Sequence, residues 1–239
     1  MKKLGILTIG QSPRPDVLGE LMPLFDNDIQ ILEAGALDGL SAAEIVKMQP
    51  GPDDRMLVTR LADGTVVHVA EEALMGCMQG QIKCLEEKGA KCIFVLCTAR
   101  FQGLHSQVPL IQPGDILNET IPKWSQNSAI GVLSPEPEQV EATRRDWKGI
   151  VDCLEVLTAS PYGSMAEIDG AARAFGQMDI DLIVLDCMGY TEKIRKRMEA
   201  LSGKPVILSK TLAAERAAAM QPRGWRMRRK HWKWEILNC

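Results

Sequence analysis

The chain has 239 residues, of which 46% are hydrophobic and 25% charged, and its formal net charge is −3 at pH 7. This length and composition are typical of a globular protein with a full core. The small negative charge gives no electrostatic reason to bind nucleic acid or an anionic membrane, and no apolar run reaches the roughly 18 residues of a transmembrane helix.

Short β-rich runs alternate with helical patterns along the whole chain. Eight strands are expected, at residues 4–9, 29–34, 92–96, 108–111, 129–133, 151–156, 182–185 and 205–208. The clearest helical patterns between them lie at residues 71–88, 138–147 and 191–201. Alternation of this kind is typical of βαβ units and therefore predicts an α/β protein with mostly parallel sheets.

An internal repeat divides the chain into two halves. Three blocks recur at offsets of 122 or 123 residues: 12–16 (SPRPD) as 134–138 (SPEPE), 32–34 (LEA) as 154–156 (LEV), and 41–45 (SAAEI) as 164–168 (SMAEI). The third block carries a serine three residues before a glutamate in both copies, which is the capping box of a helix start. The repeat predicts two pseudo-symmetric halves, each a four-stranded, mostly parallel sheet flanked by helices.

The repeat loses its register before the third strand of the first half. Residues 95–98 (VLCT) resemble residues 185–188 (LDCM) at an offset of only 90, so about 33 extra residues lie in the first half. Two runs that alternate in polarity, 55–60 and 65–69, flank an Asp-Gly pair, which is a strong hairpin-turn signal. We therefore expect a β-hairpin inserted near residues 50–70, able to cover a site or to form the contact of a homodimer.

The expected domains are residues 1–125, which include the insert, and residues 126–222. Residues 223–239 stand apart because they hold three of the five tryptophans and six basic residues. Such a composition is also found in tails that bind nucleic acid or membranes. Since the repeat is complete before this segment, we predict an unstructured extension.

Each half places one cysteine directly after an apolar strand. Cys97 follows the run at residues 93–96, and Cys187 follows the run at residues 182–185. In parallel sheets, ligands bind outside the carboxyl ends of the strands. If the halves face each other across a pseudo-two-fold axis, one thiolate removes a proton from a substrate carbon and the opposite thiol returns one. Plain packing is the alternative for both, because cysteine is among the most often buried residues.

Further polar residues lie near the same strand ends. Ser12 and Ser134 follow the first strand of each half, and Arg14 has a guanidinium that can bind a carboxylate through two hydrogen bonds. Three other candidates for binding a carboxylate or enolate lie beside the cysteines: Thr98, Tyr190 and Thr191. The simpler alternatives are a solvated arginine and ordinary turn residues.

Motifs of several other chemistries are missing from the sequence. It has no Walker loop, no Gly-x-Gly-x-x-Gly after a strand and no Cys-x-x-Cys. The histidines, His68, His105 and His231, are scattered, so neither a zinc site nor a Ser-His-Asp triad is indicated. Seven cysteines at irregular spacing suggest no disulfide framework. We expect reduced thiols in a cytoplasmic protein and no metal site.

Four segments together resemble the AroM family: residues 7–14 (LTIGQSPR), 96–99 (LCTA), 185–190 (LDCMGY) and 205–209 (PVILS). The resemblance covers about residues 2–221. AroM proteins are similar in turn to the aspartate/glutamate/hydantoin racemase superfamily. That similarity implies two pseudo-symmetric α/β halves, no cofactor and one catalytic cysteine from each half, here Cys97 and Cys187.

The neighbours of the cysteines depart from the glutamate racemases of that superfamily. Those enzymes carry Thr-His after the second cysteine, where this chain has Met188-Gly189, and Asp-Ser-Gly in the N-terminal loop, where this chain has Gly10-Gln11-Ser12. The resemblance implies that Gln11 and Ser12 bind substrate. We therefore expect a cofactor-independent racemase, isomerase or lyase acting on a small carboxylate. The alternative is a carboxylate-binding or regulatory protein that keeps the fold without turnover.

Overall fold

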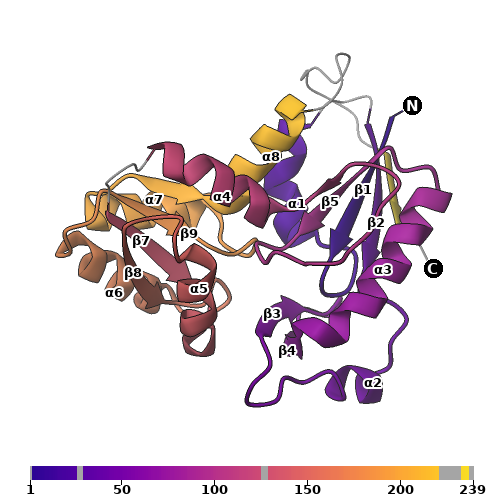
Figure 1. The fold of residues 1–239 in the computed structure, drawn as a ribbon, viewed down its shortest axis with the longest axis horizontal. Helices are drawn as coiled ribbons and strands as arrows, with labels where there is room; N and C mark the ends of the chain where they lie inside the picture. Colours follow the sequence, from indigo (N-terminus) through magenta and orange to yellow (C-terminus); the bar gives the residue numbers. More distant parts are fainter. Residues whose placement is uncertain (1, 26–28, 125–128, 221–232, 237–239) are drawn as a thin grey trace. The chain divides into compact units, whose positions relative to one another are not determined.

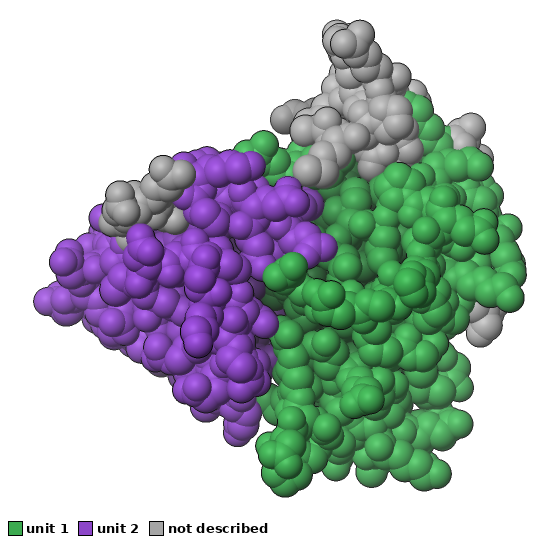
Figure 2. Space-filling view, in the orientation of Figure 1, with its two compact units in different colours: residues 1–113, 214–239 green, residues 114–213 purple. Residues whose placement is uncertain are grey.

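The structure, a computed structural model, describes residues 2–25, 29–124, 129–220 and 233–236. The chain forms two compact units, residues 1–113 with 214–239 and residues 114–213 (Figures 1 and 2). The first boundary lies at residue 113 rather than near 125, because Leu117 and Ile121 of helix α4 (Pro113–Trp124) pack into the core of the second unit. Helix α8 (Ser209–Met220) contributes to both units.

The first unit is built on a parallel sheet with the strand order β11-β2-β1-β5-β6. Its members are β1 (Lys2–Thr8), β2 (Ile29–Gly35), β5 (Cys92–Leu96), β6 (Leu110–Ile111) and β11 (Lys233–Ile236). All five residues of β5 are buried, as expected for a parallel strand covered on both faces of the sheet. All eight expected strands are present along the chain, with ends shifted by at most two residues.

Helices cover this sheet on both faces (Figure 1). Helix α3 (Glu71–Glu87) buries Leu74, Met78, Ile82 and Leu85 on one stripe, at the spacing of an amphipathic helix. They pack on a core that includes alternate residues of the strands. Helix α1 (Pro15–Leu21) and the short 3₁₀ helix η1 (Met22–Leu24) lead to Phe25, whose ring meets Phe94 of β5 edge-on at 6.3 Å.

The inserted β-hairpin is confirmed. It consists of β3 (Met56–Arg60) and β4 (Val66–Ala70), which pair antiparallel. Leu57 and Val69 pack into the core beneath α3, so the hairpin is part of the first unit. The helix before it, α2 (Ala42–Val46), begins with the expected capping box, in which Ser41 and Glu44 bond each other's backbone N–H.

The second unit repeats the same strand order. Its parallel sheet runs β10-β9-β7-β8 and consists of β7 (Ala129–Ser134), β8 (Cys153–Thr158), β9 (Leu182–Leu185) and β10 (Val206–Leu208). This order matches β6-β5-β1-β2 of the first unit position by position. The prediction of two related four-stranded parallel sheets is therefore confirmed.

Two pairs of helices enclose the second sheet. Helices α6 (Met165–Gly176) and α7 (Glu192–Ser202) share one core with Leu133, Ile183 and Leu185. Helix α4 shares another core with Val132, Val184 and Trp147, the last residue of α5 (Val140–Trp147), which follows the 3₁₀ helix η2 (Pro137–Gln139). Ser164 caps α6 as the repeat predicted, accepting from the backbone N–H of Glu167.

The C-terminal segment differs from the prediction. Residues 221–232 and 237–239 lie outside the described residues, but Lys233–Ile236 form β11, which pairs in parallel with β2. The expectation of an unstructured extension is therefore wrong for these four residues. Without them β2 would be an edge strand with unpaired N–H and C=O groups, and an open edge favours the addition of a strand. In the described part of the chain, no helix has the length and apolarity needed to cross a membrane.

Candidate functional site at the carboxyl ends of the strands

In the first unit, loops after neighbouring strands meet closely at the carboxyl edge of the sheet. Thr8, the last residue of β1, is in register with Gly35 of β2. A Cβ added to Gly35 would lie 2.5 Å from the carbonyl oxygen of Gly10 and 2.7 Å from the backbone nitrogen of Ser12. Only glycine permits this approach, so the loops after β1 and β2 form one cluster.

Ser12 is held by a carboxylate of the neighbouring loop. Its backbone N–H donates to Asp38 Oδ1 at 2.8 Å, and its hydroxyl donates to Oδ2 at 2.7 Å. The backbone N–H of Gly35 donates to the same Oδ2 at 2.7 Å. Sequence reasoning missed Asp38, although an Asp-Gly pair just after a strand is a signal for a carboxylate that organises a turn.

Gln11 joins the same cluster to the inserted hairpin. Its side-chain Nε2 donates to the carbonyl of Leu37 at 3.2 Å, and its Oε1 accepts from the backbone N–H of Ala62 at 3.0 Å. Its own backbone N–H donates to the carbonyl of Arg60 at 3.1 Å. The hairpin is thus bound directly to the loop that carries Gln11 and Ser12.

Arg14 makes its two-pronged contact with a carboxylate of its own chain. Its Nε and Nη2 donate to Asp16 Oδ1 and Oδ2, both at 2.9 Å. The side chain of Arg14 is only 6% exposed, whereas that of Asp16 is 34% exposed. Burial raises the pKa of Asp16, but the hydrogen bonds and charge of Arg14 and the charge of Arg60 outweigh it. The pKa therefore lies below the ordinary value of 3.8.

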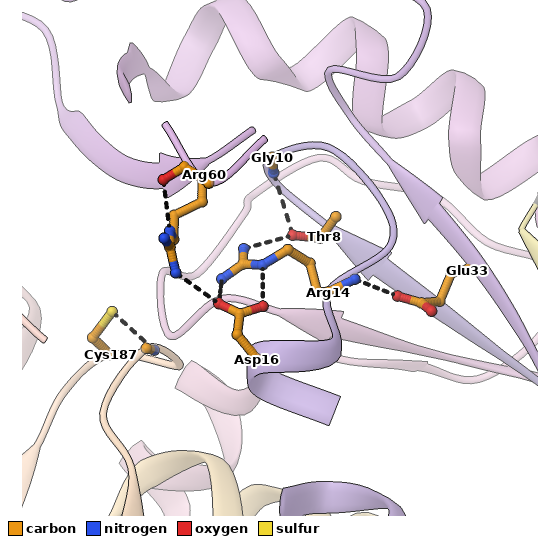
Figure 3. A network of polar contacts seen from close by, with 9 residues as sticks. Thr8, Gly10, Arg14, Asp16, Glu33, Arg60 and Cys187 are labelled. Carbon is orange, nitrogen blue, oxygen red and sulfur yellow. Dashed lines mark hydrogen bonds and ion pairs between the residues drawn. The ribbon is translucent and has the colours of Figure 1, made fainter. Parts of the chain in front are cut away.

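Further polar groups hold Arg14 in place (Figure 3). Its Nη1 donates to Thr8 Oγ1 at 3.3 Å, and that oxygen also accepts from the backbone N–H of Gly10 at 3.3 Å. The backbone N–H of Arg14 donates to Oε2 of the buried Glu33 at 2.9 Å. Glu33 lies in one of the repeated blocks, but its role inside the network was not predicted.

A second guanidinium reaches Asp16 from the hairpin. Arg60, the last residue of β3, places Nη1 3.7 Å from Asp16 Oδ2, and its side chain is 32% exposed. Its Nε donates to the carbonyl of Gly64 in the hairpin turn at 3.0 Å. Sequence reasoning missed Arg60, because it treated the insert as a cover rather than as a source of site residues.

The first candidate cysteine lies at the end of the next strand. Cys97 follows β5 and is partly buried, and its sulfur accepts from the backbone N–H of Ala99 at 3.4 Å. Thr98 lies between these two residues and is also partly buried. The loop therefore wraps back onto the sulfur two residues after the cysteine.

The second unit repeats this local geometry. Cys187, after β9, is partly buried, and its sulfur accepts from the backbone N–H of Gly189 at 3.4 Å (Figure 3). The loop then leads into the N-terminus of α7, where Thr191 is the cap residue. An N–H directed at the sulfur and a helix N-terminus both favour a negatively charged group. Each unit thus places a partly buried sulfur that accepts a backbone N–H at an equivalent strand end.

Tyr190 and Thr191 hold the loop after Cys187. Tyr190 is fully buried, and its hydroxyl donates to the carbonyl of Ala159 at 2.8 Å. Burial raises the pKa of this hydroxyl well above its ordinary value of 10. Thr191 Oγ1 accepts from the backbone N–H of Ile194 at 3.2 Å and so caps α7.

Ser134 ends β7 and is 1% exposed. Its hydroxyl oxygen accepts from Thr143 Oγ1 at 3.4 Å. Nearby at the same sheet edge, the indole N–H of Trp147 donates to Asp186 Oδ2 at 3.1 Å. The predicted residues are therefore divided between the units: Gln11, Ser12, Arg14, Cys97 and Thr98 in the first, and Ser134, Cys187, Tyr190 and Thr191 in the second.

The other cysteines have different surroundings. Cys92 is buried within β5, whereas Cys153 is exposed at the start of β8. Cys77 is partly buried. Cys84 takes part in a disulfide bond, contrary to the expectation of reduced thiols throughout. Within the described ranges, no group of three or more His, Cys, Asp or Glu residues could hold a metal ion.

Several racemases are among the solved structures with a similar fold. A glutamate racemase (isoform RacE1) from Bacillus anthracis has a TM-score of 0.64 at 15% identity, covering 98% of this chain and 87% of that one. An allantoin racemase from Klebsiella pneumoniae has a TM-score of 0.62 at 13% identity, covering 92% and 87%. An aspartate racemase from Picrophilus torridus has a TM-score of 0.58 at 14% identity, covering 95% and 96%. At such identities these similarities establish the fold alone.

No curated protein sequence matches the chain. The family model described as AroM protein, in contrast, matches residues 4–220. This range includes all the site residues described above and both parallel sheets, apart from β11 and the first two residues of β1. The two-unit architecture, with a cysteine at equivalent strand ends, agrees with the sequence motifs that resemble this family. The chain belongs to the AroM family.

Proposed function

We propose that this AroM protein is a cofactor-independent racemase or isomerase that acts on a small carboxylate through Cys97 and Cys187. The observation that carries the proposal is the repeated cysteine geometry. In each unit a partly buried sulfur follows the third strand, in chain order, of that unit's parallel sheet. The sulfur accepts a backbone N–H from two residues further on, at 3.4 Å. Packing alone does not require the same contact at both equivalent positions.

The proposed step is a proton exchange at a carbon next to a carboxylate. One cysteine, as thiolate, takes the proton from that carbon and becomes a thiol. The other, as thiol, gives its proton to the opposite face and becomes a thiolate, so protons and charge balance. The proposal requires both sulfurs to contact the same substrate. The N–H of Ala99 or Gly189 would stabilise whichever sulfur is charged.

The substrate class follows from chemistry and from the names of the fold relatives. A carbon acid needs an adjacent group that accepts the negative charge when the proton leaves, and a carboxylate or similar carbonyl provides one. The names of the three racemases reported above specify glutamate, aspartate and allantoin. All three are small and polar, and all carry a hydrogen on a stereogenic carbon next to a carbonyl group.

Proton exchange in D₂O tests the proposal directly. The wild-type chain is incubated with single enantiomers of small 2-substituted carboxylates, and loss of the α-proton is followed by ¹H NMR. Both enantiomers should exchange with the wild type and racemise. Cys97→Ser should exchange the α-proton of one enantiomer only, and Cys187→Ser that of the other, because each variant keeps one base.

Cys153→Ser is the matched control, since Cys153 is an exposed thiol at the amino end of β8, away from the carboxyl ends of the strands. It should leave exchange unchanged. Exchange that survives intact in both Cys97→Ser and Cys187→Ser would rule out the two-thiol mechanism. The absence of exchange with every substrate tested would favour the second candidate.

The second candidate is a carboxylate-binding protein without turnover. It is favoured by Met188, which is 4% exposed and offers no polar group beside Cys187. If this candidate is correct, the carboxylates used in the exchange experiment should bind the chain without exchanging their α-protons. A thermal-shift measurement detects such binding, because a ligand that binds only the folded state raises the melting temperature.

A further inference from the structure

The first unit contains two guanidinium groups that share one carboxylate unequally. Arg14 binds Asp16 through two hydrogen bonds of 2.9 Å and has a nearly buried side chain. Arg60 lies 3.7 Å from one oxygen of the same carboxylate, and about a third of its side chain is exposed. Figure 3 shows the two side chains approaching Asp16 from different sides. Arg14 is therefore committed to Asp16, while Arg60 makes the weaker contact.

The hairpin fixes the position of Arg60. Its Nε donates to the carbonyl of Gly64, and Gly64 itself has a φ of +89°, which suits glycine. A Cβ on Gly64 would lie 3.0 Å from Arg60 Nη2, so the turn packs closely on the guanidinium. These contacts orient the guanidinium before any ligand arrives, and preorganisation of this kind favours binding.

The same part of the hairpin is attached to the substrate loop proposed from the sequence. The carbonyl of Arg60 accepts from the backbone N–H of Gln11, and a Cβ on Gly10 would lie 2.3 Å from that carbonyl oxygen. The backbone N–H of Ala62 donates to the side chain of Gln11. The guanidinium of Arg60 therefore lies beside the carboxyl end of β1, the kind of position where parallel sheets bind ligands.

We propose that Arg60 is the residue of the first unit that binds the carboxylate of the substrate. A substrate carboxylate replaces the 3.7 Å contact between Arg60 and Asp16. The exchange costs little, because a partly exposed ion pair at this distance contributes little to stability and Arg14 continues to bind Asp16. The inserted hairpin is then a specificity element rather than a cover. This inference rests on the proposed function for its substrate class.

Binding measurements test the inference independently of turnover. The full chain is titrated with D- and L-glutamate, L-aspartate and malonate, with malonamide as the uncharged analogue and inorganic phosphate as the alternative anion. Arg60→Gln should bind the preferred carboxylate at least about tenfold more weakly, and should lose the preference for malonate over malonamide. Arg60→Lys should recover part of the affinity, because it restores the charge without the planar fork.

Arg55→Gln is the matched control. Arg55 immediately precedes the same hairpin, its Nε lies 3.1 Å from Glu71 Oε2 in an ion pair, and its side chain is 26% exposed. It should bind carboxylates as the wild type does. Thermal melting of all three variants shows whether each is folded. If Arg60→Gln fails to fold, the carboxylate affinities of Arg60→Lys and Arg55→Gln are compared instead. Arg60→Lys should bind more weakly than Arg55→Gln, and equal affinity of these two variants would overturn the inference.

The outcomes separate this inference from the proposed function. Unchanged affinity in Arg60→Gln, with proton exchange intact, overturns the role of Arg60 alone. Arg60-dependent binding without exchange overturns the racemase proposal and leaves the role of Arg60 standing. Phosphate binding as tight as that of any carboxylate overturns the assignment of a carboxylate ligand to Arg60. The assignment of a carboxylate ligand to Arg60 is also overturned if no carboxylate binds the wild-type chain.

Discussion

Arg14 holds both carboxylate oxygens of Asp16 at 2.9 Å, on a stretch of chain that the sequence suggested for substrate binding. The two residues are separated by a single proline, so the guanidinium folds back over the first turn of α1. This contact explains why Arg14 is 6% exposed although arginine is usually solvated. It also gives the first prediction.

Asp16→Asn should destabilise the chain at neutral pH by about 1–2 kcal/mol. The estimate is below the full value of a charge-assisted pair, because a third of the Asp16 side chain is exposed. The folded-state pKa of Asp16 is lowered, so its stabilising contribution is present above pH 3.8 and is lost as the pH falls through the lowered pKa.

The measurement is urea denaturation of wild type and Asp16→Asn at several pH values. The stability difference should be constant between about pH 5 and 7 and should shrink below the ordinary pKa of 3.8. A difference that grows on acidification would show that Asp16 is not the ionised partner of Arg14.

Gly35→Ala should disrupt the loop cluster of the first unit. The new Cβ would meet the Gly10 carbonyl oxygen at 2.5 Å and the Ser12 nitrogen at 2.7 Å, both backbone atoms that cannot swing away. We expect a loss of about 1–3 kcal/mol or more. Gly19→Ala is the control: Gly19 lies in α1 with no atom near its would-be Cβ, and alanine should stabilise the helix by roughly 0.5–1 kcal/mol. Thermal melting that ranks the two variants in the opposite order would contradict this account.

Tyr190→Phe should cost about 1–3 kcal/mol, because it leaves the carbonyl of Ala159 without the 2.8 Å hydrogen bond from a fully buried hydroxyl. Chemical denaturation measures the loss, and carboxylate titration of the folded variant measures any effect on binding. Unchanged stability together with lost binding would show that the Tyr190 hydroxyl contacts ligand rather than supporting the fold.

Thr191→Ala should remove the cap of α7 and cost about 1 kcal/mol, whereas Thr191→Ser should keep most of the stability. The loop that carries Cys187 ends at this cap, so the alanine variant should also change the alkylation rate of Cys187. Ser164→Ala removes the cap of α6 and is the matched control. Ser164→Ala should lose similar stability without changing the alkylation rate of Cys187. If both alanine variants change that rate equally, the Thr191 cap does not position the loop.

Iodoacetamide labelling with site-resolved mass spectrometry should separate the thiols. Cys92 should resist labelling in the native chain because it is buried, and Cys153 should label at the rate of an ordinary exposed thiol. Cys97 and Cys187 should label, and a bound carboxylate should slow them but not Cys153. If both resist labelling as Cys92 does, they are packing residues and the catalytic proposal fails.

The sequence determined the fold largely through the repeat and the hydrophobic pattern. The buried strands at residues 92–96 and 182–185 were located to the residue, because a continuous apolar run in a parallel sheet leaves little freedom of register. The hairpin followed from its Asp-Gly turn, and the starts of α2 and α6 followed from their capping serines. Each of these signals depends only on residues that are close together in the sequence.

Only the tertiary structure decided which polar groups meet. The pairing of Ser12 with Asp38 and the approach of Arg60 to Asp16 join residues 26 or more positions apart, and nothing in the local pattern encodes them. The same is true of β11, whose place is set by the open edge of β2 rather than by its own composition. Hydrophobic periodicity specifies which face of an element is buried, whereas hydrogen bonds between loops depend on how the strand ends are brought into register.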